Sequence, residues 1–426
     1  VVLSNDGVRV GLAICEDIWQ DGGPVAELAA EHIDVLLTIN GSPYEEGKTQ
    51  TRLDLARRRA AEVHAPMIYV NQVGGQDDLV FDGGTFVVDT DGTLLQRSPM
   101  FMEDLAYFTL DTDREHQEVC EVAPRMDPDE EVYTACVLGL KDYMAKNGFT
   151  GVCLGLSGGI DSALVAAMAA DAVGGGNVYG ISMPSMYSSQ GSKDDAADLA
   201  ANIGAHYDVQ PIKPMYDAFQ QQLALGGVSA ENLQARIRGV IVMAYSNSKG
   251  VLALATGNKS ELACGYSTIY GDAVGGYAPI KDVFKTKVWQ LARWRNSAAA
   301  AGMGVGGLHI VGNEAGDAGV QLPGGVMIPV NSITKAPSAE LRPGQKDSDS
   351  LPQYELLDRV LEAYIEHAHG RADLLADGFD DETVSTVIRL VDRAEWKRRQ
   401  YPLGPKVSAL AFGRDRRLPV TGAFRE

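Results

Sequence analysis

Six consecutive residues, Ser157 to Ser162 (S-G-G-I-D-S), have the types and order of a phosphate-binding turn. An apolar run from Val152 predicts a buried strand before the turn, and an alanine-rich stretch predicts a helix from Ser162 to Asp171. Unpaired N–H groups at a helix N-terminus attract anions, and glycines let the backbone approach a phosphate. The serines add hydroxyl donors. The Asp161 carboxylate would repel a phosphate unless a cation such as Mg²⁺ lay between them.

Two other interpretations of this turn are weaker. A lone Ser-Gly-Gly would more simply be a connection between a strand and a helix, but here all six residues lie between two such elements. The turn also lacks the lysine of the P-loop and the glycine spacing of a dinucleotide fingerprint. The sequence therefore predicts a phosphate site of another kind.

A second polar loop, Thr256 to Glu261, follows an expected strand at Val251–Ala255. Thr256 can donate to a phosphate or a ribose, and Glu261 is a carboxylate that could hold Mg²⁺ together with Asp161. An ordinary helix start, with Ser260 as N-cap and an acid in the first turn, explains the same residues. The two interpretations are compatible.

Cys15 is placed where a nucleophile could act, directly after an expected strand at Val8–Ile14. A nucleophilic thiolate must be exposed at such a strand end and activated by a neighbouring base or cation. The alternative is a small buried hydrophobic residue at the end of a strand. The next strand, Asp34–Ile39, ends in Asn40-Gly41-Ser42-Pro43.

Length and composition bound the protein class. The 426 residues fit two domains, and 57 acidic against 37 basic residues give a net charge of −20, which disfavours general nucleic-acid binding. Five cysteines without metal-type spacing indicate a reduced, cytoplasmic protein, and no run is apolar enough for a membrane span. The first residue is Val1, so we expect the sequence to start inside a domain whose first half is missing.

The first part of the chain predicts a layered α/β domain. Strands alternate with helices and end in a hairpin across Asp91-Gly92. The further helices are expected at Pro24–His32 and Thr49–His64, a strand at Met67–Val70, and the hairpin strands at Thr85–Asp89 and Thr93–Gln96. Residues 1–110 form this domain, and the acidic, proline-containing residues 111–128 form a linker.

The second domain, residues 129–426, predicts a doubly wound, mostly parallel sheet, because strands and helices alternate regularly. In such sheets ligands bind at the carboxyl ends of the strands, where both polar loops lie. Helices are expected at Asp129–Asn147, Ser192–Ile203 and Ser229–Tyr245, with one that begins at Lys285, and strands at Val178–Met183 and His206–Ile212.

The turn S-G-G-I-D-S resembles the pyrophosphatase loop of the N-type ATP pyrophosphatases, which split ATP between the α and β phosphates and adenylate an oxygen. With A-R-I-R, T-G-N-K-S-E, Y-G-D, P-S-A-E-L-R-P-G-Q and W-K-R-R-Q, residues 129–426 resemble the NAD⁺ synthetase family. The resemblance implies ATP-dependent amidation of deamido-NAD⁺ to NAD⁺, with ammonia as the nitrogen donor.

The resemblance also implies roles for individual residues. ATP would contact Gly155, Leu156, Ser157, Gly158, Gly159, Ile160, Asp161, Ser162, Thr256, Lys285 and Ser338, and Mg²⁺ would bind Asp161 and Glu261. Deamido-NAD⁺ would face Asn232, Arg236, Glu261, Tyr266, Asp272, Trp396 and Lys397. A homo-oligomer is expected.

The segment C-E-D-I-W and the later N-G-S-P resemble the nitrilase-like amidases and, more narrowly, the glutaminase domain of glutamine-dependent NAD⁺ synthetases. The resemblance implies that Cys15 is the nucleophile and that Ser42 and Lys48 lie near the glutamine. The family also uses a Glu base and a Lys upstream of its cysteine, but no Glu or Lys precedes Cys15 here. We therefore expect this chain to use ammonia rather than glutamine as its nitrogen donor. We also expect the half-domain to expose an apolar face.

One stretch departs from the family pattern. A Gly/Ala-rich insertion begins at Ser297 and extends to about residue 325, and its composition predicts a mobile loop. Two alternatives to the synthetase remain open from the sequence. One is another pyrophosphatase-loop amidotransferase, which would need its own substrate motifs, and the other is a non-catalytic nucleotide-binding module.

Overall fold

The computed structural model describes residues 2–5, 7–301 and 326–422. It divides into two compact units. Unit 1 contains the described residues up to Gly75 and Leu79–Ala135, and unit 2 contains Gln76–Asp78 and the described residues from Cys136 onward. The change from one unit to the next therefore falls within helix α3 (Pro128–Asn147).

Unit 1 is built on one mixed sheet with the strand order β1-β2-β3-β4-β7-β8. Its three central strands are parallel neighbours, whereas β1, β7 and β8 pair antiparallel. The strands are β1 (Val2–Asn5), β2 (Val8–Ile14), β3 (Val35–Asn40), β4 (Met67–Asn71), β7 (Phe86–Val88) and β8 (Leu94–Arg97). A separate hairpin, β5 (Val73–Gln76) and β6 (Leu79–Asp82), was not predicted.

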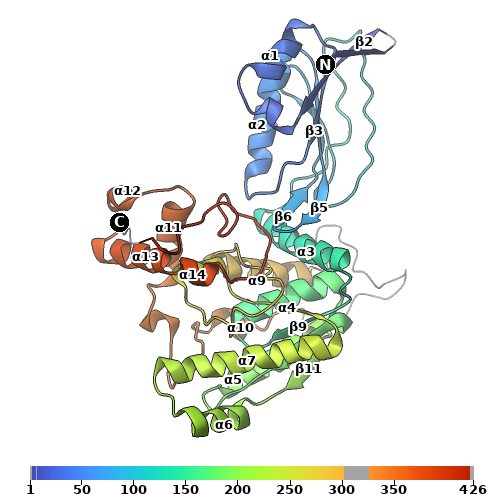
Figure 1. The fold of residues 1–426 in the computed structure, drawn as a ribbon. Helices are drawn as coiled ribbons and strands as arrows, with labels where there is room; N and C mark the ends of the chain where they lie inside the picture. Colours follow the sequence, from blue (N-terminus) through green and yellow to red (C-terminus); the bar gives the residue numbers. More distant parts are fainter. Residues whose placement is uncertain (1, 6, 302–325, 423–426) are drawn as a thin grey trace. The chain divides into compact units, whose positions relative to one another are not determined.

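Two helices, α1 (Gly23–Ala30) and α2 (Lys48–Val63), pack with the sheet of unit 1 into one hydrophobic core (Figure 1). Ala13, Leu36 and Tyr69 belong to that core. On three adjacent strands, the side chains of Ile14, Ile39 and Val70 are paired in register and remain 67%, 60% and 42% exposed. An exposed apolar surface therefore lies at the carboxyl ends of β2, β3 and β4.

Unit 2 contains the expected parallel sheet, with the order β11-β10-β9-β12 and every pairing parallel. The strands are β9 (Val152–Gly155), β10 (Val178–Ser182), β11 (His206–Val209) and β12 (Leu252–Ala253). The helices of this part are α4 (Ile160–Val173), α5 (Gln190–Ile203), α6 (Lys213–Leu223) and α7 (Val228–Lys249). Residues of α7 share a core with Cys153 of β9 and Ile181 of β10.

The remaining helices of unit 2 build a second core around α8 (Lys259–Cys264), α11 (Tyr354–Ile365) and α13 (Asp381–Arg393). The other helical elements of unit 2 are η2 (Gly175–Asn177), α9 (Lys285–Ala300), α10 (Val330–Thr334), η4 (Asp347–Asp349), α12 (Arg371–Ala376) and α14 (Glu395–Arg398), and unit 1 also contains η1 (Cys15–Ile18). Among the described residues, no helix is both long and apolar enough to cross a bilayer.

The structure confirms the α/β class, and most predicted elements lie within a few residues of their expected positions. Helix α6 was not predicted, and residues after Val209 that were expected to continue a strand lead into it instead. The insertion prediction is wrong at its start, because Ser297 to Ala300 continue α9 as helix. Residues 302–325 of the insertion lie outside the described residues.

A buried ion pair fixes α2 in unit 1. Arg52 and Asp82 of β6 are 3% and 1% exposed, and Arg52 Nη1 lies 2.6 Å from Asp82 Oδ2. We expect Arg52→Met to lower the free energy of unfolding of unit 1 by about 3–5 kcal/mol, because it leaves a buried carboxylate without its counter-charge. Urea unfolding with peptide-resolved hydrogen exchange measures this loss.

Arg57→Met on the same helix is the matched control, since Arg57 is 41% exposed and pairs with an exposed Asp54. Exposed pairs contribute about 0–1 kcal/mol. Equal losses of unfolding free energy in the two variants would show that the buried Arg52–Asp82 pair stabilises unit 1 no more than an exposed pair does.

Candidate functional site

The predicted phosphate turn lies between β9 and α4. Gly159 is the N-cap of α4, and no side chain caps the first turn of the helix. The serines brace the loop from within, because Ser157 Oγ and Ser162 Oγ lie 3.1 Å apart and Ser162 Oγ donates to Gly159 O at 3.0 Å. The first N–H groups of α4 are thus available to an anion.

A cavity of about 810 Å³ opens beside this turn within unit 2. It brings together nearly all residues that the sequence assigned to ATP, Mg²⁺ and deamido-NAD⁺, from segments far apart along the chain. The lining residues among them are Gly155, Leu156, Ser157, Gly159, Ile160, Asp161, Ser162, Asn232, Thr256, Glu261, Tyr266, Asp272, Lys285, Ser338 and Lys397. Gly158, Arg236 and Trp396 do not line it.

Charged groups meet where α4, α8 and α9 begin. Lys285 is 2% exposed, contacts Asp161 Oδ2 directly and lies 3.8 Å from Glu261 Oε1. Burial and the nearby Asp161 raise the pKa of Glu261 well above its usual range, while Lys285 opposes this shift. Burial alone would lower the pKa of Lys285, but Asp161 and Glu261 reverse the effect and leave it raised. The charge states of the Lys285 ammonium and of the two carboxylates are therefore coupled.

The donor set around Lys285 fits a divalent cation. A third carboxylate, Asp347, lines the same cavity and is 5% exposed. Its Oδ2 accepts from Tyr354 at 3.0 Å, whereas its buried Oδ1 has no hydrogen-bond partner among the described residues. Three carboxylates thus face one ammonium, and carboxylate oxygens beside a phosphate turn are of the kind that bind Mg²⁺ together with substrate phosphates.

Buried contacts anchor the second loop to the C-terminal part of unit 2. Lys259 is fully buried, and its Nζ donates to Glu366 at 2.6 Å and to Leu410 O at 2.9 Å and lies 3.0 Å from Asp282. Ser260 Oγ accepts from the Lys285 N–H at 2.9 Å. The loop that carries Thr256 and Glu261 is therefore fixed on both sides.

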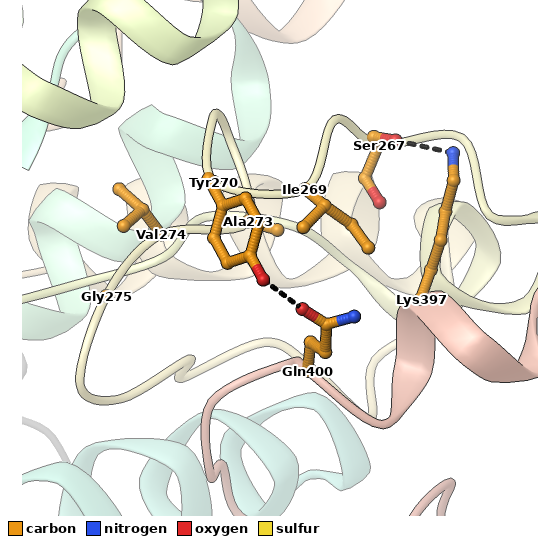
Figure 2. A pocket seen from close by; sticks show the side chains of 8 residues that line it. All are labelled: Ser267, Ile269, Tyr270, Ala273, Val274, Gly275, Lys397 and Gln400. Atoms are coloured by element: carbon orange, nitrogen blue, oxygen red, sulfur yellow. Dashed lines mark hydrogen bonds between the residues drawn. The ribbon is translucent and has the colours of Figure 1, made fainter.

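The Tyr- and Gly-rich loop forms another wall, as Figure 2 shows from close by. Lys397 Nζ donates to Gly265 O at 2.6 Å and to Ser267 O at 2.7 Å, and Tyr270 OH donates to Gln400 at 2.7 Å. These residues border a small cavity of about 100 Å³, which shares Ser267, Val274 and Lys397 with the large one. The wall is therefore closed by hydrogen bonds to α14 and the residues just after it.

Three neighbours of the cavity differ from expectation. Arg236 Nε donates to Ile269 O at 3.3 Å, and Trp396 is 50% exposed. Arg238, two residues after Arg236, lines the cavity instead, and burial lowers its pKa to about 10. The proposed contacts of Arg236 and Trp396 stay predictions.

Arg238, Lys335 and Asp347 are among the charged lining residues to which the sequence assigned no role. Lys335 Nζ lies 2.8 Å from Asp195 of α5 and stands just before the P-S-A-E-L-R-P-G-Q motif, which was the signal available for it. Asp347 lies in an acidic segment, and the sequence pattern there does not indicate which carboxylate faces a cavity.

In unit 1, Cys15 is half-buried, begins η1 and has a φ of 42°, a left-handed backbone that is strained for a residue with a Cβ. Ser42 is held in place by Arg52, whose Nε donates to Ser42 Oγ at 3.1 Å, and by Asn71, whose Oδ1 accepts from Ser42 N at 3.0 Å. Lys48 Nζ lies 5.9 Å from the centre of the Trp19 ring.

Tyr69 lies in the core beside this region, where burial raises the pKa of its hydroxyl and the charge of Arg52 opposes the shift. The Tyr69 hydroxyl has no hydrogen-bond partner among the described residues. Strained residues with a reactive side chain are typical of functional sites, so Cys15 remains a candidate nucleophile.

Two family models match the chain. "NAD synthase" matches residues 132–401, and "Carbon-nitrogen hydrolase" matches residues 1–117. The two ranges follow one another along the chain without overlap.

Similar proteins match almost the whole chain. The glutamine-dependent NAD(+) synthetase of Acinetobacter baylyi is 44% identical over 98% of this chain and 74% of its own length. The protein of the same name from Rhodobacter capsulatus is 46% identical over 98% of this chain and 74% of its own length. A solved glutamine-dependent NAD+ synthetase from Acinetobacter baumannii, in complex with ADP, matches at 42% identity and a TM-score of 0.70 over 99% of this chain and 74% of its own.

Gly158 is the position of the turn least able to carry a side chain. Its φ is +78°, and an added Cβ would lie 2.1 Å from Ser192 O. We expect Gly158→Ala to weaken ATP binding by about 5- to 150-fold, because a strained φ costs about 1–3 kcal/mol. Isothermal titration with ATP measures the change.

Gly176→Ala is the matched control, because an added Cβ there meets nothing within 4 Å. It should leave ATP binding unchanged. Normal ATP affinity in a folded Gly158→Ala protein would show that the turn is not part of the ATP-binding site.

Proposed function

Because the chain belongs to the glutamine-dependent NAD⁺ synthetase family, we propose that it converts deamido-NAD⁺ to NAD⁺ by ATP-dependent amidation, with ammonia that the family obtains from glutamine. One observation supports this most strongly. A turn suited to phosphate, two or three carboxylates suited to a cation, and a Lys397-bordered wall share one cavity of about 810 Å³. That volume suits two nucleotide substrates side by side.

The reaction has two steps. An oxygen of the nicotinate carboxylate attacks the α-phosphorus of ATP, the bond to the bridging oxygen breaks, and pyrophosphate leaves. Ammonia then attacks the carbon of the adenylated carboxyl, a proton is released, and AMP leaves as the amide forms. The protein supplies mainly position and charge, since holding two reactants in the right geometry accounts for much of such a barrier.

The ATP side would be formed by the backbone N–H groups of the turn, the hydroxyls of Ser157, Ser162 and Thr256, and Lys285 and Ser338. Asp161 and Glu261 would hold Mg²⁺, which neutralises phosphate charge when bound. The buried ammonium of Lys285 offers a second positive charge next to the same phosphates. Exclusion of water from this cavity protects the adenylate from hydrolysis.

The dinucleotide side would be formed by Asn232, Arg236, Glu261, Tyr266, Asp272, Trp396 and Lys397. Thr268 Oγ1 donates to Asn232 Oδ1 at 2.8 Å, and Thr268 N donates to Asp272 Oδ1 at 2.8 Å, so that two of these side chains are oriented by one residue. Asp272 is an exposed residue that lines the cavity, and desolvation by the surrounding protein raises its pKa. An oriented acid at this wall suits a ligand rich in hydroxyl groups.

In unit 1, Cys15 would be the glutaminase nucleophile, with Ser42 and Lys48 near the glutamine. We propose residues 1–110 and 129–426 as the two domains, with 111–128 between them. A homo-oligomer, a cytoplasmic location and the absence of nucleic-acid binding are also proposed, the last two because all five cysteines are free thiols and the net charge is −20.

Pyrophosphate release tests the function. With ATP and Mg²⁺, release should require deamido-NAD⁺, and ammonium should then yield NAD⁺. Asp161→Asn should abolish release, because it removes a carboxylate beside the phosphates, while circular dichroism stays unchanged. Pyrophosphate release with another carboxylate substrate would indicate a different amidotransferase, and none with any substrate would indicate a binding module.

The nitrogen source gives a separate prediction. Ammonium should support turnover, and any turnover with glutamine should depend on Cys15, the proposed nucleophile. Initial rates with saturating glutamine and with ammonium measure the difference.

Cys15→Ala is the control variant. It should remove any glutamine-dependent rate and leave the ammonium-dependent rate unchanged, and an unchanged glutamine-dependent rate would contradict the role of Cys15.

A further inference from the structure

Asn258 lies between the two carboxylates that the proposed function assigns to Mg²⁺. It is fully buried, at 0% exposure. Its side-chain Nδ2 donates to Asp161 Oδ1 at 2.9 Å, and its backbone N–H donates to Glu261 Oε2 at 3.3 Å. One residue therefore contacts one oxygen of each carboxylate, although Asp161 lies on α4 and Glu261 on α8.

The other oxygen of each carboxylate faces a common point. Lys285 Nζ contacts Asp161 Oδ2 directly and lies 3.8 Å from Glu261 Oε1. Asn258 thus hydrogen-bonds to Asp161 Oδ1 and Glu261 Oε2. The other oxygens, Asp161 Oδ2 and Glu261 Oε1, face the same ammonium. This is the arrangement expected when an outer residue orients two carboxylates toward a shared cation.

A helix cap alone does not account for Asn258. Its Oδ1 accepts from Glu261 N at 3.0 Å, and this bond and the Asn258 N–H bond to Glu261 form a capping box on α8, but Ser, Thr and Asp cap helices about as well. Of these residues only Asn also carries an N–H₂ donor in its side chain. The contact with Asp161, made across 97 positions of the chain, uses that donor.

We propose that Asn258 is a positioning residue that orients Asp161 and Glu261 for the divalent cation, an inference that rests on the proposed function. It touches neither substrate nor cation and acts through the two carboxylates. Its removal should therefore change the affinity for the cation more than the stability of the fold. Loss of such an outer partner typically costs about 10–100-fold in metal affinity.

The test uses Asn258→Ser and Asn258→Thr, which retain the cap oxygen and lose the amide donor. Mn²⁺ binding is measured by electron paramagnetic resonance in the presence of α,β-methylene-ATP, and pyrophosphate release is measured against Mg²⁺ concentration. We expect Mn²⁺ binding about 10–100-fold weaker. Raised Mg²⁺ should restore most of the rate.

Two reference variants accompany them. Glu261→Gln removes a proposed ligand and should weaken Mn²⁺ binding at least as much. Asp380→Ala removes an N-cap that accepts from Thr383 N at 2.9 Å on α13 and should change the melting temperature without changing Mn²⁺ binding.

The outcomes separate the inference from the function on which it rests. Normal Mn²⁺ binding in Glu261→Gln would overturn the metal role itself. Weakened binding in Glu261→Gln with normal binding in both Asn258 variants would overturn only the role of Asn258. Loss of folded protein in both Asn258 variants would also overturn it, because Asn258 would then serve the fold rather than the carboxylates.

Discussion

The buried ammonium of Lys285 is the interaction on which the site depends. A lysine that is 2% exposed keeps its charge only if carboxylates compensate for lost water, and Asp161 and Glu261 do so. These groups come from the first turns of three helices, α4, α8 and α9. The cluster therefore forms only when all three helices start at the same place, so that the electrostatics of the site and the packing of unit 2 are coupled.

The fold provides that convergence by two means. Parallel strands β9 and β12 are neighbours, and their carboxyl ends bring the phosphate turn and the Thr256–Glu261 loop together. Buried charges then fix the helices, since Arg295 of α9 forms two hydrogen bonds to Asp171 of α4 at 2.7 and 2.8 Å, and Lys259 holds the loop to the C-terminal segment. A preorganised site of this kind needs little rearrangement when charge develops on a phosphate.

Local patterns predicted much of this site, and distant contacts explain what was missed. The Ser157–Ser162 turn and Glu261 could be predicted because each is identified by its immediate neighbours in the sequence. Asn258 and Asp347 could not, because their roles arise from contacts with residues far along the chain. Arg236 was assigned from the family resemblance, but it is Arg238, two residues later, that lines the cavity. Helix α6 was missed because none of its residues is buried, so no core supported the pattern.

The central claim is that the nicotinate carboxylate becomes adenylated in the cavity of unit 2. The most direct measurement uses deamido-NAD⁺ with ¹⁸O in that carboxylate, together with ATP, Mg²⁺ and ammonium, and mass spectrometry of the products. The account predicts one ¹⁸O atom in AMP and none in pyrophosphate. AMP without ¹⁸O, or label in inorganic phosphate, would contradict it.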